Sequence, residues 1–221
     1  MKVKILFFGS SGNSALVKNA LIKAGYKLVD QPDKADLTIS ADYGQKLPSG
    51  GLNLHPSLLP QYRGPAPVPQ QILNNEKESG ITIIKMTDQF DAGPIIAQEK
   101  VTILPEDTAP DLLKRCFMAG AKLLIKILPD YLNNKITLFL QDESQVTYTR
   151  KFTKADGFIS WEEFKAGGPE HKIRALFPWP GVWTTMPNNK ILKLLPKNMF
   201  QLEGKQPITR QQFLAGYKQF L

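Results

Sequence analysis

Residues 3–24 read Val-Lys-Ile-Leu-Phe-Phe-Gly-Ser-Ser-Gly-Asn-Ser-Ala-Leu-Val-Lys-Asn-Ala-Leu-Ile-Lys-Ala, and this stretch indicates the fold class. A nearly continuous apolar run at 3–8 is followed by a glycine-containing turn at 9–13. A helical pattern then covers about 14–24 and ends at Gly25. A buried strand, a tight turn and a helix in this order are typical of the opening of a doubly wound α/β domain.

Five further short apolar runs predict the remaining strands of that domain, at 26–29, 37–41, 52–54, 81–86 and 95–101. Apolar residues at steps of three and four predict a long amphipathic helix from about Thr108 to Leu128, with Pro129 ending it. Cys116 falls on the apolar face of that helix, which predicts a buried thiol. We therefore predict a Rossmann-like, mostly parallel sheet with flanking helices.

The chain is expected to divide into a catalytic domain at 1–140, a polar linker at 141–158 and a reduced basic C-terminal domain at 159–221. The last of these is predicted to be small, truncated and rich in β-structure. It should contain a short helix near 169–176, a hairpin closed by Asn188-Asn189 and a final helix at about 209–220.

The net charge of +8 is unevenly distributed along the chain. Residues 1–150 carry 17 Lys and Arg against 15 Asp and Glu, a net +2, whereas residues 151–221 carry 11 against 5, a net +6. The positive charge of the C-terminal third is typical of a segment that binds RNA phosphates. The alternative is a solvated lysine-rich surface without a binding role. The N-terminal apolar run is too short for a signal peptide, and no run is long enough to span a membrane, so we expect a cytoplasmic protein.

The turn at 9–13, Gly-Ser-Ser-Gly-Asn, could hold a phosphate at the N-terminus of the following helix. It matches neither the dinucleotide-binding nor the P-loop pattern in full. A tight structural turn therefore remains open as the alternative.

The stretch at 52–67, Leu-Asn-Leu-His-Pro-Ser-Leu-Leu-Pro-Gln-Tyr-Arg-Gly-Pro-Ala-Pro, contains the candidate catalytic residues. Asn53 and His55 are two residues apart on a predicted strand, so their side chains share one face. They lie near the strand's C-terminal end, where open α/β sheets bind ligands. The prolines that follow stiffen the loop, and Leu58 and Leu59 make it a suitable wall for a flat, partly apolar ligand.

Together with 79–83 (Ser-Gly-Ile-Thr-Ile) and 88–95 (Asp-Gln-Phe-Asp-Ala-Gly-Pro-Ile), this stretch resembles the signature of the folate-dependent formyltransferases. Members of that family act on methionyl-tRNA, glycinamide ribonucleotide or sugars. Their catalytic aspartate, in an Asp-x-Gly setting, matches Asp91. The resemblance implies transfer of a formyl group from the co-substrate 10-formyltetrahydrofolate to an amine, with no metal.

The chemistry of formyl transfer needs the residue types found at these positions. The amide of Asn53 and a protonated His55 can both donate a hydrogen bond to the oxyanion that forms when an amine attacks the formyl carbon. Asp91 would supply a carboxylate beside His55 and relay the proton of the amine.

The same resemblance implies where the folate binds. The family's Ser-Leu-Leu-Pro loop contacts the folate, and the segment matching 42–48 borders the pterin. Asp42 and Lys46 replace residues that are usually small or apolar in this segment. The residues expected at the folate are Ser57, Leu58, Leu59, Pro60, Tyr43, Gly44 and Leu47.

The second half of the chain resembles the family members that act on methionyl-tRNA, through the stretches 141–144, 173–181 and 202–217. The implied acceptor is therefore the initiator methionyl-tRNA. Two internal gaps relative to those members, at 25–37 and after 191–195, imply a shortened version without the usual basic tRNA-binding loop. One alternative acceptor is a small amine such as an amino-sugar nucleotide or glycinamide ribonucleotide. The other alternative is a non-catalytic protein that binds folate or RNA.

Two groups of residues are expected to contact the acceptor. Near the catalytic residues these are Arg63, Ser11 and Asn13. In the basic C-terminal part, the expected contacts to tRNA phosphates are Lys172, Arg174, Lys190, Lys193, Lys197, Lys205 and Arg210.

Overall fold

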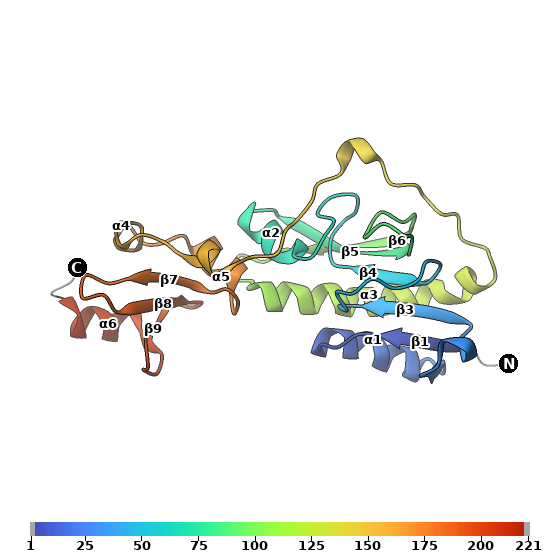
Figure 1. The fold of residues 1–221 in the computed structure, drawn as a ribbon, viewed down its shortest axis with the longest axis horizontal. Helices are drawn as coiled ribbons and strands as arrows, with labels where there is room; N and C mark the ends of the chain where they lie inside the picture. The colour runs from blue at the N-terminus through green and yellow to red at the C-terminus, as the bar shows by residue number, and fades with distance from the viewer. Residues whose placement is uncertain (1–2, 219–221) are drawn as a thin grey trace. The chain divides into compact units, whose positions relative to one another are not determined.

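The computed structural model describes residues 3–218 and divides the chain into two compact units (Figure 1). Unit 1 comprises residues 1–68, 77–103 and 111–150, and unit 2 comprises residues 69–76, 104–110 and 151–221. The units therefore divide after residue 150, within the stretch 141–158 for which the sequence predicts a linker.

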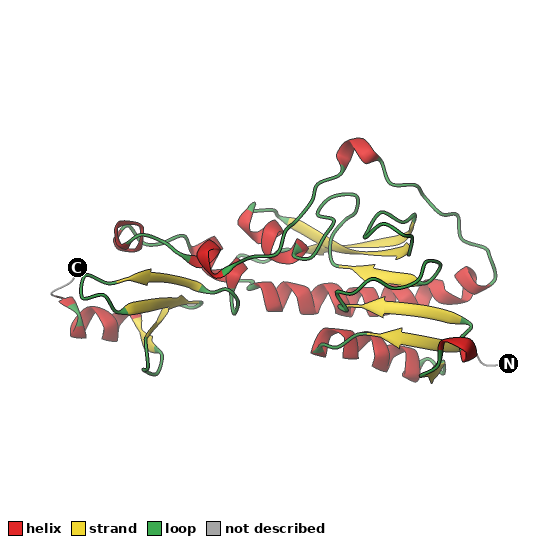
Figure 2. Ribbon diagram, viewed as in Figure 1, coloured by secondary structure: helices red, strands yellow, loops and turns green. Residues whose placement is uncertain are grey.

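The helices and strands follow one another as Figure 2 shows. Up to residue 132 they are β1 (Lys4–Phe8), α1 (Gly12–Lys23), β2 (Lys27–Val29), η1 (Pro32–Lys34), β3 (Leu37–Ala41), β4 (Leu52–His55), α2 (Pro67–Leu73), β5 (Glu78–Lys85), β6 (Ile95–Thr102) and α3 (Ala109–Leu132). Then come η2 (Glu143–Gln145), η3 (Lys154–Gly157), α4 (Trp161–Lys165), α5 (Glu170–Leu176), β7 (Val182–Thr185), β8 (Ile191–Leu195), β9 (Met199–Leu202), β10 (Ile208–Thr209) and α6 (Arg210–Gly216).

The sheet of unit 1 has the strand order β2-β1-β3-β4-β5-β6. The pairs β1–β2, β1–β3 and β3–β4 are parallel, whereas β4–β5 and β5–β6 are antiparallel. The expected mostly parallel α/β sheet is thus confirmed. Because β1, β3 and β4 are parallel, the segments that follow them all leave the same edge of the sheet.

The turn between β1 and α1 approaches the end of β3 closely. A Cβ atom at Gly9 would lie 2.7 Å from the carbonyl oxygen of Ala41, so this position requires glycine. The helix that follows begins with a capping box, in which the Ser11 hydroxyl accepts from the backbone N–H groups of Asn13 and Ser14. The sequence therefore fixes both the turn and the start of α1.

Helix α3 supplies much of the apolar core of unit 1. Leu112, Phe117, Leu124 and Leu128 are completely buried, as is Cys116, which confirms the expected buried thiol. Gly120 lets the helix approach the sheet, because a Cβ atom there would lie 2.8 Å from Cγ1 of Ile81.

The expectation that Pro129 ends this helix is wrong, since α3 continues to Leu132. Proline removes its own N–H but keeps its carbonyl, and the carbonyl of Pro129 accepts from both the backbone N–H and the side-chain amide of Asn133. The last turn can therefore form beyond the proline.

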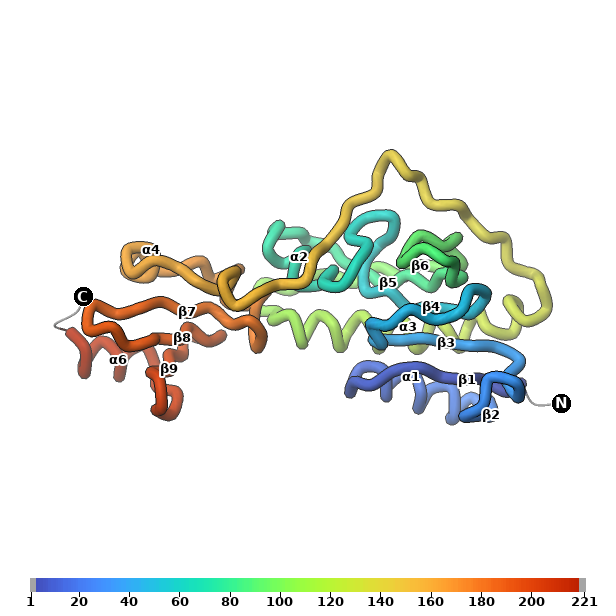
Figure 3. The backbone as a smooth tube through the Cα atoms, viewed as in Figure 1, coloured from blue at the N-terminus to red at the C-terminus, as the bar shows by residue number. Residues whose placement is uncertain are grey.

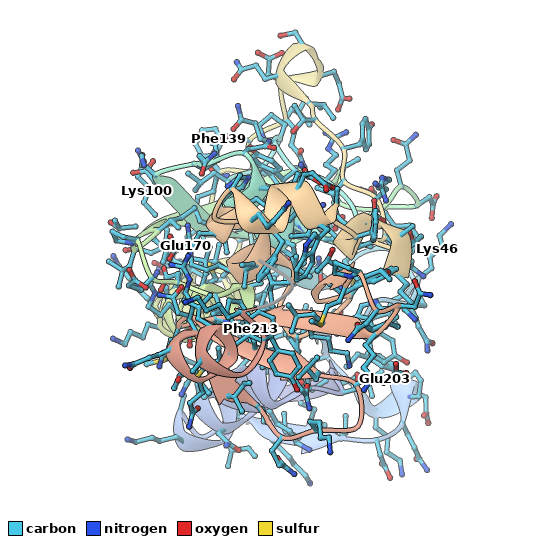
Figure 4. The ribbon with its side chains drawn as sticks, turned by 90° about the vertical axis from the view of Figure 1, so that its left-hand side faces the viewer. Lys46, Lys100, Phe139, Glu170, Glu203 and Phe213 are labelled. Carbon is cyan, nitrogen blue, oxygen red and sulfur yellow. The ribbon has the colours of Figure 1, made fainter. Side chains whose placement is uncertain are left out.

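Unit 2 contains an antiparallel sheet of order β10-β9-β8-β7 together with short helices. The rings of Phe164, Phe200 and Phe213 contact one another edge to face, with centroids 5.2–5.9 Å apart. Phe213, labelled in Figure 4, comes from α6 and is completely buried.

The predicted hairpin at 188–189 joins β7 to β8, and Asn189 adopts the positive φ of 63° that such a turn needs. The expected final helix ends at Gly216, and Phe220 lies outside the described residues.

No helix within residues 3–218 combines the length and the apolar character needed to cross a membrane.

Candidate active site

His55 is the last residue of β4 and only 4% exposed. Its Nε2 lies 2.9 Å from the carbonyl oxygen of Tyr62. Because a carbonyl can only accept, Nε2 carries a hydrogen. Its Nδ1 lies 3.4 Å from Oδ1 of Asp91. Both nitrogens of this buried imidazole therefore face oxygen acceptors.

Asp91 reaches His55 by way of a loop that folds back over the sheet. Strand β5 is antiparallel to β4, and its last residue, Lys85, pairs with Leu52 at the start of β4. The loop 86–94 therefore begins at the end of β4 that is distant from His55. Asp91 has a φ of 55°, and its Oδ2 accepts from the backbone N–H of Gly64 at 2.9 Å.

The Asp-x-Gly spacing has a steric cause. A Cβ atom at Gly93 would lie 1.8 Å from the carbonyl oxygen of Lys85, so no other residue fits where the loop passes the end of β5. Gly93 thus allows the close return that brings Asp91 over the sheet.

Asn53 precedes His55 by two residues on β4 and is half-buried. Strand alternation places its side chain on the same face as His55, whereas Leu52 and Leu54 are buried on the opposite face. The structure thus brings His55 and Asp91 together and places Asn53 on the same face of the same strand.

The loop 57–60 is held against β5 by the Thr82 hydroxyl. This hydroxyl donates to the carbonyl oxygen of Ser57 at 2.6 Å and accepts from the N–H of Leu59 at 3.1 Å. The Ser57 hydroxyl itself donates to the carbonyl oxygen of Gln61. Ser57 and Leu59 are buried, whereas Leu58 and Pro60 are partly exposed. Of the four expected folate contacts in this loop, two side chains therefore face the protein interior.

The other expected folate contacts, Tyr43, Gly44 and Leu47, follow β3 at the same sheet edge as the loop after β4. The Tyr43 ring lies 5.1 Å from the ring of Phe8. Tyr43 and Leu47 are half-buried and Gly44 is exposed, with a φ of 71°. This segment therefore offers both apolar side chains and exposed backbone.

Arg63, which the sequence led us to expect at the substrate, is only 2% exposed. Its Nε and Nη2 donate to Oε1 of Gln141 at 3.0 and 2.8 Å, and Nη1 and Nη2 donate to the carboxylate of Glu143. The guanidinium is thus occupied by acceptors within unit 1. No local pattern predicts this contact of Gln141, which belongs to the stretch 141–144 that resembles the family.

The expectation of a phosphate at Ser11 and Asn13 also conflicts with the structure. The hydroxyl of Ser11 caps α1 and donates to the carboxylate of Asp42. A carboxylate at this helix N-terminus repels an anion, and the cap already takes the N–H groups that would bind one. The geometry favours the alternative of a tight structural turn.

The seven basic residues of unit 2 that we expect to contact tRNA phosphates fall into two classes. Lys172 donates to the carbonyl oxygen of Phe158 and Arg174 to that of Asp107, each at 2.9 Å, and both side chains are half-buried. The others are exposed: Lys190, Lys193, Lys197, Lys205 and Arg210. The exposed set is available to a polyanion, whereas the first two side chains support the local fold.

Comparison with known proteins agrees with this geometry. A family model described as "Formyl transferase" matches residues 24–128, and one described as "Formyl transferase, C-terminal domain" matches residues 151–200. The chain belongs to the formyl transferase family. Among curated relatives, it is 38% identical over 193 residues to the methionyl-tRNA formyltransferase of Listeria innocua. That match covers 77% of this chain and 61% of the relative, so the chain spans about three fifths of the relative's length.

Solved structures of low sequence identity share the fold. HypX from Aquifex aeolicus in complex with tetrahydrofolic acid has a TM-score of 0.76 at 16% identity, and the match covers 97% of this chain and 47% of that one. A sugar N-formyltransferase from Shewanella has a TM-score of 0.66 at 19% identity, and the match covers 87% and 96%.

Within residues 3–218, no group of three or more His, Cys, Asp and Glu side chains is placed to hold a metal ion.

Proposed function

We propose that the protein transfers a formyl group from 10-formyltetrahydrofolate to the amino group of initiator methionyl-tRNA. The observation that carries this proposal is the buried pair of His55 and Asp91, 3.4 Å apart, with Asn53 on the same strand face. Membership of the formyl transferase family and the names of the curated relatives support it.

In this proposal the three side chains divide the chemistry. Asn53 donates its amide N–H to the oxyanion that forms when the amine attacks the formyl carbon. With Nε2 donating to the Tyr62 carbonyl, Nδ1 is also a donor only when His55 is protonated. In that form the Nδ1 hydrogen, 3.4 Å from Oδ1 of Asp91 and thus beyond the 2.7–3.2 Å of ordinary N–H···O bonds, can be shared with the oxyanion. Asp91 accepts the proton that the attacking amine loses. The tetrahedral intermediate then collapses as the bond between the formyl carbon and the folate nitrogen breaks, and that nitrogen takes up a proton to leave as tetrahydrofolate.

The residues at the sheet edge suit the folate co-substrate, which supplies the formyl group bound to nitrogen. The partly exposed Leu58 and Pro60 and the half-buried Tyr43 and Leu47 offer apolar surface to a flat ring. The exposed backbone at Gly44 can hydrogen-bond the polar edge of such a ring. The fold is also that of HypX, which has been solved with tetrahydrofolic acid.

Methionyl-tRNA is preferred as the acceptor for two reasons. The curated relatives are named for it, and the Asp42 carboxylate at the start of α1 disfavours the phosphate of a small nucleotide at that turn. The exposed basic residues of unit 2 would hold tRNA phosphates by counterion release. An amino-sugar nucleotide is the second candidate, because a sugar N-formyltransferase shares the fold.

A direct assay tests the proposal. The purified protein is incubated with 10-formyltetrahydrofolate and, in parallel, with initiator methionyl-tRNA, glycinamide ribonucleotide or an amino-sugar nucleotide. We expect kcat/KM for methionyl-tRNA to exceed the others by at least about a hundredfold. A preference for a small acceptor, or transfer to none of them, would refute the assignment.

A further inference from the structure

Asp91 is held in a backbone conformation that non-glycine residues seldom adopt. Its φ of 55° lies in the left-handed region, which Asp adopts more readily than most L-residues but still in a minority of cases. Such a conformation persists only where the surroundings determine it. The surroundings of Asp91 should therefore contain groups that fix both its main chain and its carboxylate.

The main chain is fixed by the side-chain amide of Gln141. Its Nε2 donates to the carbonyl oxygens of Asp91 and Gly93, both at 2.7 Å. One amide group thus bridges the two residues that flank Ala92. Gln141 is itself held near the start of β6, because Phe139 (labelled in Figure 4) pairs with Ile95 through two backbone hydrogen bonds.

The orientation of the Gln141 amide is set by Arg63. A guanidinium can only donate, so Oε1 of Gln141 must face Nε and Nη2 of Arg63. Nε2 is then left to donate to the loop that contains Asp91. The burial of Arg63 prevents water from replacing this arrangement.

Arg63 and Gly64 therefore control Asp91 from two sides. The backbone N–H of Gly64 holds the carboxylate directly, and Arg63 holds the carbonyl through Gln141. Backbone hydrogen bonds between Arg63 and the chain at 147–149 fix this pair, and Thr147 also accepts from the N–H of Tyr62. Figure 3 shows the course of the backbone that leads out of α3 into this segment.

We infer that Gln141, oriented by Arg63, is a positioning residue that keeps the Asp91 carboxylate beside His55. The inference rests on the proposed function in so far as it concerns turnover. Gln141 touches no reacting atom and acts only through Asp91.

The decisive variant is Gln141→Glu. It keeps the size of the side chain and an acceptor for Arg63, but it replaces the amide donor with an oxygen that repels the carbonyls of Asp91 and Gly93. We expect kcat to fall about 10- to 100-fold with KM for the acceptor within about threefold, because a small misplacement of a catalytic group has an effect of this size. The melting temperature should fall only modestly, because the carbonyl oxygens of Asp91 and Gly93 lose their donor but the pairing with Arg63 is kept.

Glu143→Gln is the matched control. It replaces one of the two carboxylate oxygens that accept from Nη1 and Nη2 of Arg63 but keeps the size of the side chain. The Glu143 side chain is 70% exposed, and its hydrogen bonds from Arg63 do not involve the loop that contains Asp91. We expect its kcat to stay within about twofold of the wild type. Equal losses in the two variants, or an unchanged kcat in Gln141→Glu, would overturn the inference.

A crystal structure of the Gln141→Glu variant separates this inference from the proposed function. We expect the distance between Nδ1 of His55 and Oδ1 of Asp91 to lengthen by about 1 Å or more as Asp91 leaves its left-handed conformation. An unchanged distance would overturn the inference even if the wild type is active.

If the wild type transfers no formyl group, the proposed function fails, and the crystal structure still decides the role of Gln141. If Gln141→Glu does not fold, Gln141→Met removes the donors without adding charge and serves for both measurements.

Discussion

Arg63 in unit 1 and the exposed lysines of unit 2 carry the same charge but have opposite surroundings. Arg63 is 2% exposed, and its three nitrogens all donate to Gln141 or Glu143. Lys193, Lys197 and Lys205 are exposed to solvent. A cation whose donors are all satisfied inside the protein stabilises the fold and holds its neighbours, whereas an exposed one remains available to an external anion.

This comparison separates two kinds of substitution. Changes around His55, Asp91 and Arg63 should affect turnover or stability, and changes among the exposed lysines should affect acceptor binding.

Asp91→Asn should lower kcat by about 10²- to 10⁴-fold, the usual contribution of a general acid–base group, and His55→Ala by about 10²- to 10³-fold, the usual effect of losing an oxyanion donor. Steady-state kinetics with methionyl-tRNA measures the effect, and circular dichroism checks that each variant is folded. Near-wild-type turnover in either variant would show that the pair does not take part in the reaction.

Arg63→Met should lower the free energy of unfolding by about 2 kcal/mol, because it leaves Oε1 of Gln141 without the donors that Arg63 supplies. Urea unfolding gives the difference from the wild type. If Arg63→Met is as stable as the wild type but has a higher KM for methionyl-tRNA, Arg63 contacts the substrate. Arg63 and the exposed lysines would then have the same role.

Reversing the charges of Lys193, Lys197 and Lys205 to Glu should raise KM for methionyl-tRNA up to about tenfold at low salt, with kcat nearly unchanged. Each lost phosphate contact should also make the dependence of log K on log salt shallower by about one. Lys18→Glu with Lys23→Glu, on the exposed face of α1, is the control. Equal effects in the two sets would mean that the charge acts without regard to position.

The smallest expected effect concerns Glu143. Its hydrogen bonds from Arg63 lower the pKa of its carboxyl from the ordinary value of 4.5. A lowered pKa stabilises the fold above the unfolded-state value and loses this contribution as the pH falls through the folded-state value. The melting temperatures of wild type and Glu143→Gln should therefore differ slightly at pH 6 and converge as the pH falls below the ordinary value of 4.5. A difference that grows in acid would contradict this coupling.

The sequence by itself determined the main helices and strands of unit 1 and the residue types at the C-terminal end of β4. The apolar runs gave β1 to β6 and the periodic pattern gave α3, because strand and helix periodicity depend on neighbouring residues. The spacing of Asn53 and His55 placed them on one face, and the resemblance around Asp91 singled out the carboxylate. The short elements α2, α4 and β9 were not predicted, since they are too brief to show a period.

Only the tertiary structure decided which polar residues meet. Arg63, Asp91 and Gln141 lie far apart along the chain, yet four side-chain hydrogen bonds join Gln141 to Arg63, Asp91 and Gly93. The antiparallel return of β5 starts the Asp91 loop at the distant end of β4, and Gly93 permits it to fold back. Burial likewise turned Arg63 from an expected substrate contact into an internal support. Long-range pairing and burial depend on how the elements pack, and no local pattern around Arg63 or Gln141 contains that information.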